Sequence, residues 1–175
     1  MKVKRIFSAL VAAVMAMAVA VPSFAAGGNA NISSTTYLDG VAVNGEINIG
    51  NYTFGGAENV VKSTNTILSG VVSAGDINIT DVATLFGKNV ADISQTYIGN
   101  TVSGGSISIN EFKEIIYKNT AYCISTTING VVADGLNINK LLETYGTYEN
   151  LEAALQNVIN NAYFDGDVNI NSIIE

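Results

Sequence analysis

Ile47-Asn48-Ile49, Ile77-Asn78-Ile79 and Ile107-Ser108-Ile109 form one apolar, polar, apolar triplet that returns every 30 residues. Flanking positions keep the same interval: Thr36, Thr66, Thr96 and Thr126, and Gly45, Gly75, Gly105 and Gly135. An undisturbed period of this length is typical of a tandem-repeat protein, in which each copy follows the same backbone path and packs mainly on its neighbours. We therefore expect a stack of similar units.

The first half of each unit predicts two strands joined by a turn. It is rich in threonine and β-branched residues, which favour extended backbone, and it runs into pairs such as Asn44-Gly45 that suit a type I′ hairpin turn. In the triplet that follows, Ile47 and Ile49 should face inward and Asn48 outward, because successive side chains of a strand alternate between its two faces.

The second half of the unit predicts a short helix. Thr80-Asp81 precedes Val82, Leu85 and Phe86, an i, i+3, i+4 spacing that marks one helical face, and Asn110-Glu111 opens a similar segment. Residues 140–161 carry a longer apolar pattern that Gly146 should divide into two helices sealing one end of the stack.

The predicted fold class is accordingly α+β, built from tandem strand-turn-strand-helix repeats of about 30 residues. The alternative is an all-β solenoid, in which each unit is one coil and the segments at Asp81 and Glu111 are strands. Residues 26–175 should form one repeat domain, with copies near 36–65, 66–95, 96–125 and 126–157 and a partial copy over 158–175.

Residues 1–25 read as a secretory signal peptide. Lys2, Lys4 and Arg5 precede an apolar run over residues 6–21, and Ser23-Phe24-Ala25 is a small-x-small cleavage sequence. Cleavage after Ala25 would leave 5 basic and 15 acidic residues, a net charge of −10. The expected location is extracellular, in a bacterium, with no membrane attachment after cleavage.

Composition argues against an enzyme. The chain has no histidine and no tryptophan, which removes histidine-dependent relays, imidazole metal ligands and the usual aromatic-lined sugar cleft. A carboxylate-based hydrolase using Asp76, Asp81 or Glu111 is the least favoured hypothesis. The acidic balance also disfavours nucleic acid and anionic membranes as partners.

Two segments resemble a known calcium-binding repeat. Residues 75–86 and 105–116 resemble the loop-to-helix half of an EF-hand, and more closely the duplicated repeat of dockerins, which attach secreted bacterial enzymes to cohesin scaffolds. The resemblance implies a calcium-dependent docking module. However, the first ligand positions of the loop fall on Gly70, Val72 and Ala74, which offer no side-chain oxygen.

The last copy keeps the most ligand-type side chains at loop spacing, and a weak calcium site is therefore predicted at Asn161, Asp165, Asp167 and Asn169. No other cofactor is expected. Stacking of the copies should also produce amide ladders at Asn48, Asn78 and Ser108 and at Asn59, Asn89 and Asn119. The lone Cys123, at the repeat position of Ser63 and Ile93, is expected to be a buried small side chain.

Together these features predict a secreted, non-enzymatic structural or protein-interaction protein. Its partner would be an extracellular or cell-surface protein, and the strand edges at the ends of the stack favour self-association, since the chain has no proline after Pro22 to block them. The calcium-dependent docking module is the alternative.

Overall fold

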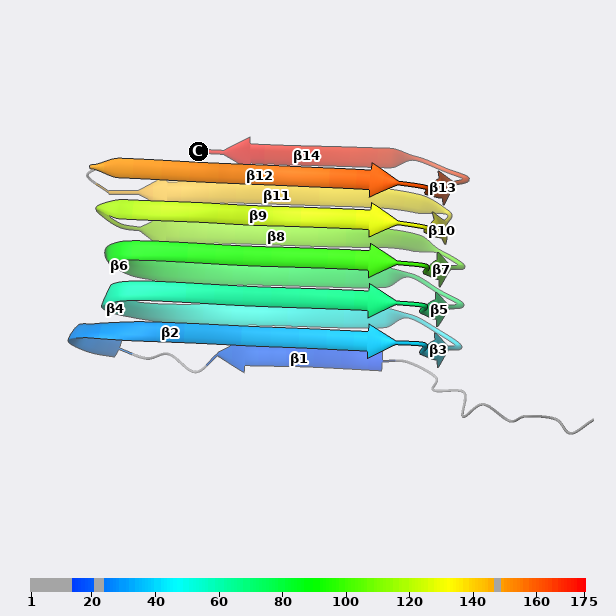
Figure 1. Cartoon of the computed structure of the whole chain (residues 1–175), viewed down its shortest axis with the longest axis horizontal. Coiled ribbons are helices and arrows are strands. Elements are labelled where there is room, and N and C mark those ends of the chain that lie inside the picture. The colour runs from blue at the N-terminus through cyan, green and yellow to red at the C-terminus, as the bar shows by residue number, and fades with distance from the viewer. Residues whose placement is uncertain (1–13, 21–23, 147–148) are drawn as a thin grey trace, which may run out of the picture.

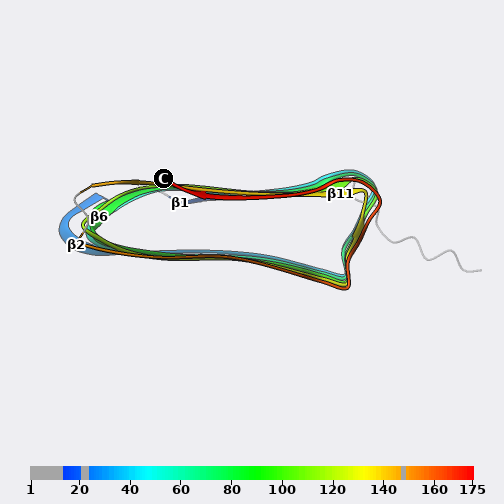
Figure 2. The same cartoon turned by 90° about the horizontal axis from the view of Figure 1, so that it is seen from above.

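A computed structural model describes residues 14–20, 24–146 and 149–175 and shows a parallel β-solenoid. The chain winds into successive coils, so that strands distant in sequence lie in parallel one above another (Figure 1). Viewed along the stack, each coil is a flattened loop with two long walls, a bend at one end and a short wall at the other (Figure 2).

Fourteen strands build three walls in the described part of the chain. The first wall contains β1 (Val14–Ala20), residues 47–57 of β4 (Ile47–Ser69), residues 77–87 of β6 (Ile77–Gly99), β8 (Ser106–Ile116), β11 (Gly135–Tyr145) and β14 (Val168–Ile174). The second wall contains β2 (Phe24–Asp39), residues 59–69 of β4, residues 89–99 of β6, β9 (Asn119–Asn129) and β12 (Asn150–Asn160). The short wall contains β3 (Ala42–Val43), β5 (Val72–Ser73), β7 (Val102–Ser103), β10 (Val132–Ala133) and β13 (Tyr163–Phe164).

The 30-residue period of the sequence is the circumference of one coil. Ile47 pairs with Ile77 and Ile77 with Ile107, so that equivalent residues of successive coils stand in a column. The column continues through Leu136 and Val168 in the last coils. The repeat predicted from the sequence is therefore the structural unit.

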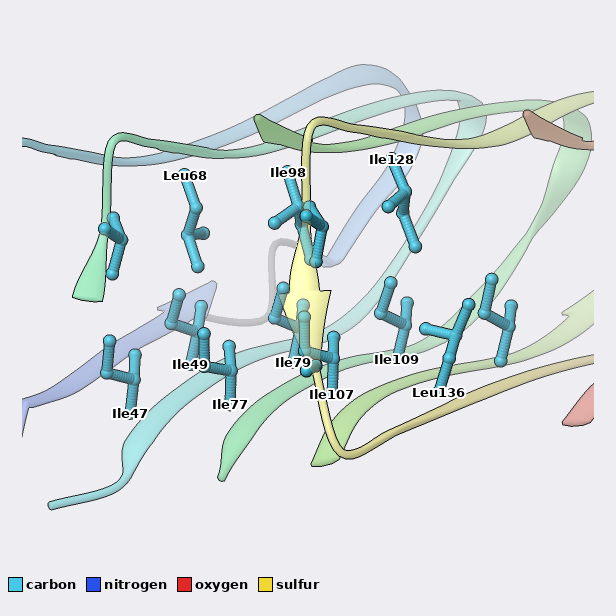
Figure 3. Close-up of a cluster of buried hydrophobic side chains, with 14 of the residues drawn as sticks. Ile47, Ile49, Leu68, Ile77, Ile79, Ile98, Ile107, Ile109, Ile128 and Leu136 are labelled. Carbon is cyan, nitrogen blue, oxygen red and sulfur yellow. The ribbon is translucent and has the colours of Figure 1, made fainter. Parts of the chain in front are cut away.

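The lumen between the walls holds an aliphatic core at the end near the short wall. The isoleucines of the triplets face inward, as predicted, and are at most 2% exposed. They meet Leu68, Ile98 and Ile128 from the second wall (Figure 3). Full burial of one such side chain contributes about 2 kcal/mol to folding, and the columns repeat that contribution in every coil.

The predicted α+β class is wrong, and the all-β solenoid alternative fits the structure. No helix occurs in the described residues, and the segments expected to be helical after Asp81 and Glu111 continue as strands in β6 and β8. Asp81, Ala83 and Leu85 all face the lumen, which is strand alternation. The prediction assumed that charged residues point to solvent; here they point inward, and this hid the period of two.

The other predicted turns and helices change in the same way. Residues 140–161 are the end of β11, a turn and β12, not two helices. The pairs at Gly45 and its equivalents do not form hairpins, because all strands pair in parallel. Positive φ occurs instead five residues earlier, in the column that contains Gly40, Gly70, Asn100, Gly130 and Asn161.

Gly105 serves close stacking of coils instead of a hairpin turn. A Cβ atom there would lie 3.0 Å from the backbone nitrogen of Asp76 in the preceding coil. Cys123 also differs from expectation: it is exposed, because it lies between two inward-facing neighbours, Tyr122 and Ile124, on β9. The prediction that it is buried was wrong.

Part of the predicted signal peptide is placed against the first coil. β1 pairs in parallel with residues 47–53 of β4, with Val14 opposite Ile47. Residues 1–13 and 21–23 lie outside the described part, and removal of residues 1–25 stays a prediction. Within the described ranges, no helix is both long and apolar enough to span a membrane.

A matched pair of isoleucines tests the direction of the side chains. Ile109 is fully buried and Ile93 is 42% exposed, so Ile109→Ala should cost about 2–4 kcal/mol and Ile93→Ala less than about 1 kcal/mol. The shift of the urea unfolding midpoint of each variant checks this. Equal shifts would contradict the assignment of the inner and outer faces.

Candidate functional site

Six charged side chains meet inside the solenoid, at the centre of the flattened lumen. The first wall contributes Asp81, Glu111 and Lys140, which occupy one column, together with Lys113. The second wall contributes Lys62 and Asp92, which are paired in the next column. We call these six residues the lumen cluster: Lys62, Asp81, Asp92, Glu111, Lys113 and Lys140.

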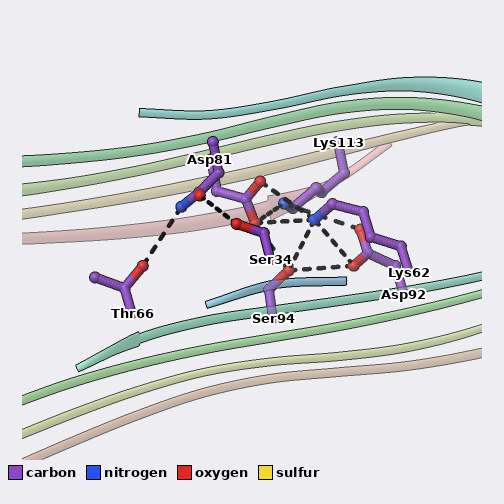
Figure 4. A network of polar contacts seen from close by, with 8 residues as sticks. Ser34, Lys62, Thr66, Asp81, Asp92, Ser94 and Lys113 are labelled. Atoms are coloured by element: carbon purple, nitrogen blue, oxygen red, sulfur yellow. Dashed lines mark hydrogen bonds and ion pairs between the residues drawn. The ribbon is translucent and has the colours of Figure 1, made fainter. Parts of the chain in front are cut away.

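Lys62 and Asp81 join the two walls at the centre of the cluster (Figure 4). Lys62 Nζ lies 3.2 Å and 3.0 Å from the two carboxylate oxygens of Asp81, and 3.3 Å from Asp92 Oδ1. Ser94 Oγ accepts a hydrogen bond from Lys62 Nζ at 3.3 Å and lies 3.0 Å from Asp81 Oδ2, to which it donates. Lys113 forms a second ion pair with Asp81 and lies 3.9 Å from Asp92 Oδ2.

Lys140 holds the next level of the cluster. Its Nζ donates across the lumen to the backbone carbonyls of Gln156, at 2.9 Å, and Ile124, at 3.4 Å. Burial lowers the pKa of Lys140, and the Glu111 carboxylate opposes that shift. The lysine thus ties the first wall to the main chain of the second.

Burial and charge compete at each group. Burial raises the pKa of Asp81, but the ammonium groups of Lys113 and Lys62 outweigh it and hold the pKa below its ordinary value. Burial lowers the pKa of Lys62 against the attraction of Asp92. For Glu111 burial dominates and raises the pKa to about 7, with Lys113 and Lys140 opposing it only in part.

The lumen cluster is closed to solvent. The side chains of Lys62, Lys113 and Asp92 are fully buried and that of Asp81 is 5% exposed. Three lysines face three acids, so the cluster is formally balanced, as buried ion pairs must be to offset their desolvation. Groups with this placement cannot reach a substrate, and their effect is to fix the distance between the walls.

The sequence reasoning missed this cluster, although it named two members in other roles. Asp81 and Glu111 were predicted as helix N-caps or, in the least favoured hypothesis, as hydrolase carboxylates. The available signal was their 30-residue spacing, repeated by Lys62 and Asp92. In a solenoid that spacing places side chains of opposite charge in the same or facing columns.

The four residues of the predicted calcium site all lie in the last coil, near β13. Asn161 and Asn169 use their side-chain amides to bond Asn129 and Asn137 of the preceding coil, at 3.1 Å and 3.0 Å. Asp165 and Asp167 flank the turn after β13. Among the described residues, no group of three or more histidine, cysteine, aspartate or glutamate side chains is arranged to hold a metal. Calcium binding stays a prediction.

Amide ladders run along the outside, as predicted for two columns. Asn59 donates to Asn29 Oδ1 at 2.8 Å, Asn89 to Asn59 at 2.6 Å and Asn119 to Asn89 at 2.9 Å, and the last coil adds Asn150 at 2.8 Å. Asn78 donates to Asn48 in the second column at 3.0 Å. Each amide donates toward the N-terminal end, so the ladders have a direction.

A groove of about 820 Å³ follows the first of these ladders on the second wall. Its lining alternates amides with small apolar side chains: Asn59, Asn89, Asn119 and Asn150 with Val60, Val61, Val90, Ala91 and Ala121, closed by Glu149 and Glu152 among others. It is the largest concave surface found on the described residues.

The outer face of the first wall carries a row of large apolar side chains. One column contains Tyr52, Val82, Phe112, Leu141 and Ile173. Tyr52, Phe112 and Ile173 are 44%, 40% and 48% exposed. We call this column the apolar row. Single exposed apolar residues are ordinary, but a continuous row across five strands is typical of an interaction surface.

Comparison with known proteins gives no relative: no protein-family model, curated protein or solved structure matches this chain. The functional argument therefore rests on the residues and geometry described above.

Breaking the charge balance of the lumen cluster should be costly. Lys62→Met leaves Asp81 and Asp92 with one facing lysine and should destabilise the fold by about 3–5 kcal/mol. The double variant Lys62→Met, Asp92→Leu restores the balance and should recover most of this loss. Lys88→Met, which removes an exposed pair with Glu58, should cost less than about 1 kcal/mol. Thermal melting compares the three, and a double variant no more stable than Lys62→Met would contradict the balance argument.

The raised pKa of Glu111 predicts a pH dependence of stability. Between its ordinary value of 4.5 and about 7, the folded state holds a proton that the unfolded chain has released. Stability should therefore fall as pH rises through this window, by up to about 3 kcal/mol. Glu111→Gln should remove this contribution, whereas the exposed Glu114→Gln should keep it. Melting curves across the window test this; parallel curves for both variants would be inconsistent with it.

Proposed function

We propose that this protein is a secreted, non-enzymatic structural protein that binds other proteins through its outer face. The apolar row on the first wall carries this proposal. A rigid parallel solenoid holds its side chains at one residue per coil, a spacing near 4.8 Å. Such an array suits a flat or extended partner surface, not a small substrate.

The placement of reactive groups supports a non-enzymatic role. The carboxylates and lysines with shifted pKa values belong to the lumen cluster, which solvent does not reach. Catalytic groups need access to a substrate in a pocket, and the groove on the second wall is lined mainly by amides already bonded to one another. These features favour a scaffold.

Surface charge favours a protein partner over other macromolecules. With residues 1–25 removed, the chain carries a net charge of −10, which repels phosphate backbones and anionic lipid headgroups. Aromatic and aliphatic side chains such as Tyr52 and Phe112 are the types that anchor protein interfaces. We infer that the partner is an extracellular or cell-surface protein.

The apolar row should dominate binding to that partner. Phe112→Ser, at its centre, should weaken binding of residues 26–175 to the envelope fraction of the producing cells by about 10-fold or more. Ile93→Ser, equally exposed on the second wall, is the matched control and should bind as the parent does. Co-sedimentation over a range of concentrations measures both. No binding by the parent, or equal loss in both variants, would overturn the assignment of this row.

A further inference from the structure

We propose that one partner of the mature chain is a second copy of itself, with β14 of one molecule adding in parallel to the edge of β4 in the next. The result would be a continuous, head-to-tail solenoid. This inference rests on the proposed function in one respect, namely that the chain is exported and residues 1–25 are removed.

The C-terminal end of the solenoid is an unfinished core. β12, β13 and β14 each pair on one side only in the described structure. Val168 and Ile170 stand in the columns of Ile107 and Ile109, which are fully buried, yet they are 48% and 44% exposed. Exposed edges with an apolar inner face favour the addition of another strand.

The N-terminal end offers the complementary edge. Its first-wall edge, residues 47–53 of β4, is covered by β1, and β1 lies within the predicted signal peptide. Removing residues 1–25 uncovers this edge and takes away the strand beside Ile47 and Ile49. The edges of β2 and β3, on the other two walls, are also unpaired in the described structure.

The registers of the two ends match. Val168 belongs to the column that Ile47 begins, so β14 of a second copy can take the place of β1. Val168 would then lie beside Ile47, Asn169 beside Asn48 and Ile170 beside Ile49. The apolar column and the amide column both continue across the junction, whereas β1 places Met15 opposite Asn48.

The second wall continues in the same way. Asn150 and Asn29 end the same amide ladder, and Leu151, 44% exposed, stands in the column that begins at the buried Ala30. Stacking β12 on β2 of the next copy would cover Leu151. It would also extend the ladder in its existing direction, with the amide of Asn29 donating to the outer oxygen of Asn150.

The strands of two copies complete one coil without overlap. β14 occupies the column positions of residues 47–53, and the paired run of β2 that starts at Asn29 begins at the position of residue 59. The contact joins unlike ends, because the strands and the ladders have a direction. A heterologous contact of this kind does not close a dimer, and it propagates into a filament.

Two electrostatic consequences follow. Asp167 precedes Val168 as Glu46 precedes Ile47, so the junction brings two carboxylates together between chains that already repel each other. Assembly should therefore increase with salt, which screens this repulsion. The attached β1 occupies the acceptor edge, so the uncleaved chain should remain monomeric.

Sedimentation velocity and electron microscopy test the assembly. Residues 26–175 should form filaments with concentration and salt, and the full 175-residue chain should not. Ile170→Lys, which places a charge on the inner face of the donor strand, should abolish assembly and, added to the parent chain, should shorten filaments by capping one end. Ile93→Lys, of similar exposure on the lateral surface, is the matched control. Circular dichroism of each variant establishes that it is folded.

Cross-linking tests the register. In a Cys123→Ser background, Asn48→Cys with Asn169→Cys should give a ladder of disulfide-linked oligomers, whereas Asn78→Cys with Asn169→Cys should not. A folded, monomeric 26–175 chain, or equal cross-linking in both pairs, would overturn the proposal. Filaments formed equally by the uncleaved chain would overturn the role of β1.

The two proposals fail in different ways. A monomeric chain that still binds the envelope through Phe112 would refute only the assembly. Filaments that bind no envelope protein would refute only the interaction assigned to the apolar row.

Discussion

Parallel pairing of each coil with the next is the constraint on which this structure depends. A coil has no core of its own, because its two walls enclose only one layer of side chains, and its backbone groups are satisfied by the coils above and below. Equivalent residues must therefore occupy equivalent positions, and the sequence repeats at the length of one turn. The same constraint produces the isoleucine columns inside and the asparagine ladders outside.

The lumen cluster shows how much charge such a frame accepts. Burying a lysine or an aspartate alone is unfavourable by several kcal/mol, and only a matched partner offsets this. Here Lys62 and Asp81 meet from opposite walls, while Asp92 and Lys113 complete the set. Because the groups sit in fixed columns, their distances are set by strand spacing. The cluster also specifies which walls and coils face each other, since a shift of one coil would place like charges together.

The stacking that stabilises the interior leaves the ends unsatisfied. Interior coils pair on both sides, but the last strands do not, and Val168 and Ile170 remain exposed where their column neighbours are buried. The lateral surface is different: its strands are fully paired and its ladders are bonded, so only side chains such as those of the apolar row are available for contact. Growth at the ends and binding along the side are therefore physically separate properties of one fold.

The sequence by itself determined the repeat, its length, the inward isoleucines and the asparagine ladders, because these follow from a strict period and from alternation within a triplet. It did not determine the strands at Asp81 and Glu111, since alternation is visible only when apolar residues face inward, and here half of the inward positions are charged. Only the tertiary structure decided that these charges face the lumen: Asp81 is buried because Lys62, 19 residues earlier, reaches it from the opposite wall. A partner supplied by the fold cannot be read from local sequence, and for that reason the helices were predicted in place of strands.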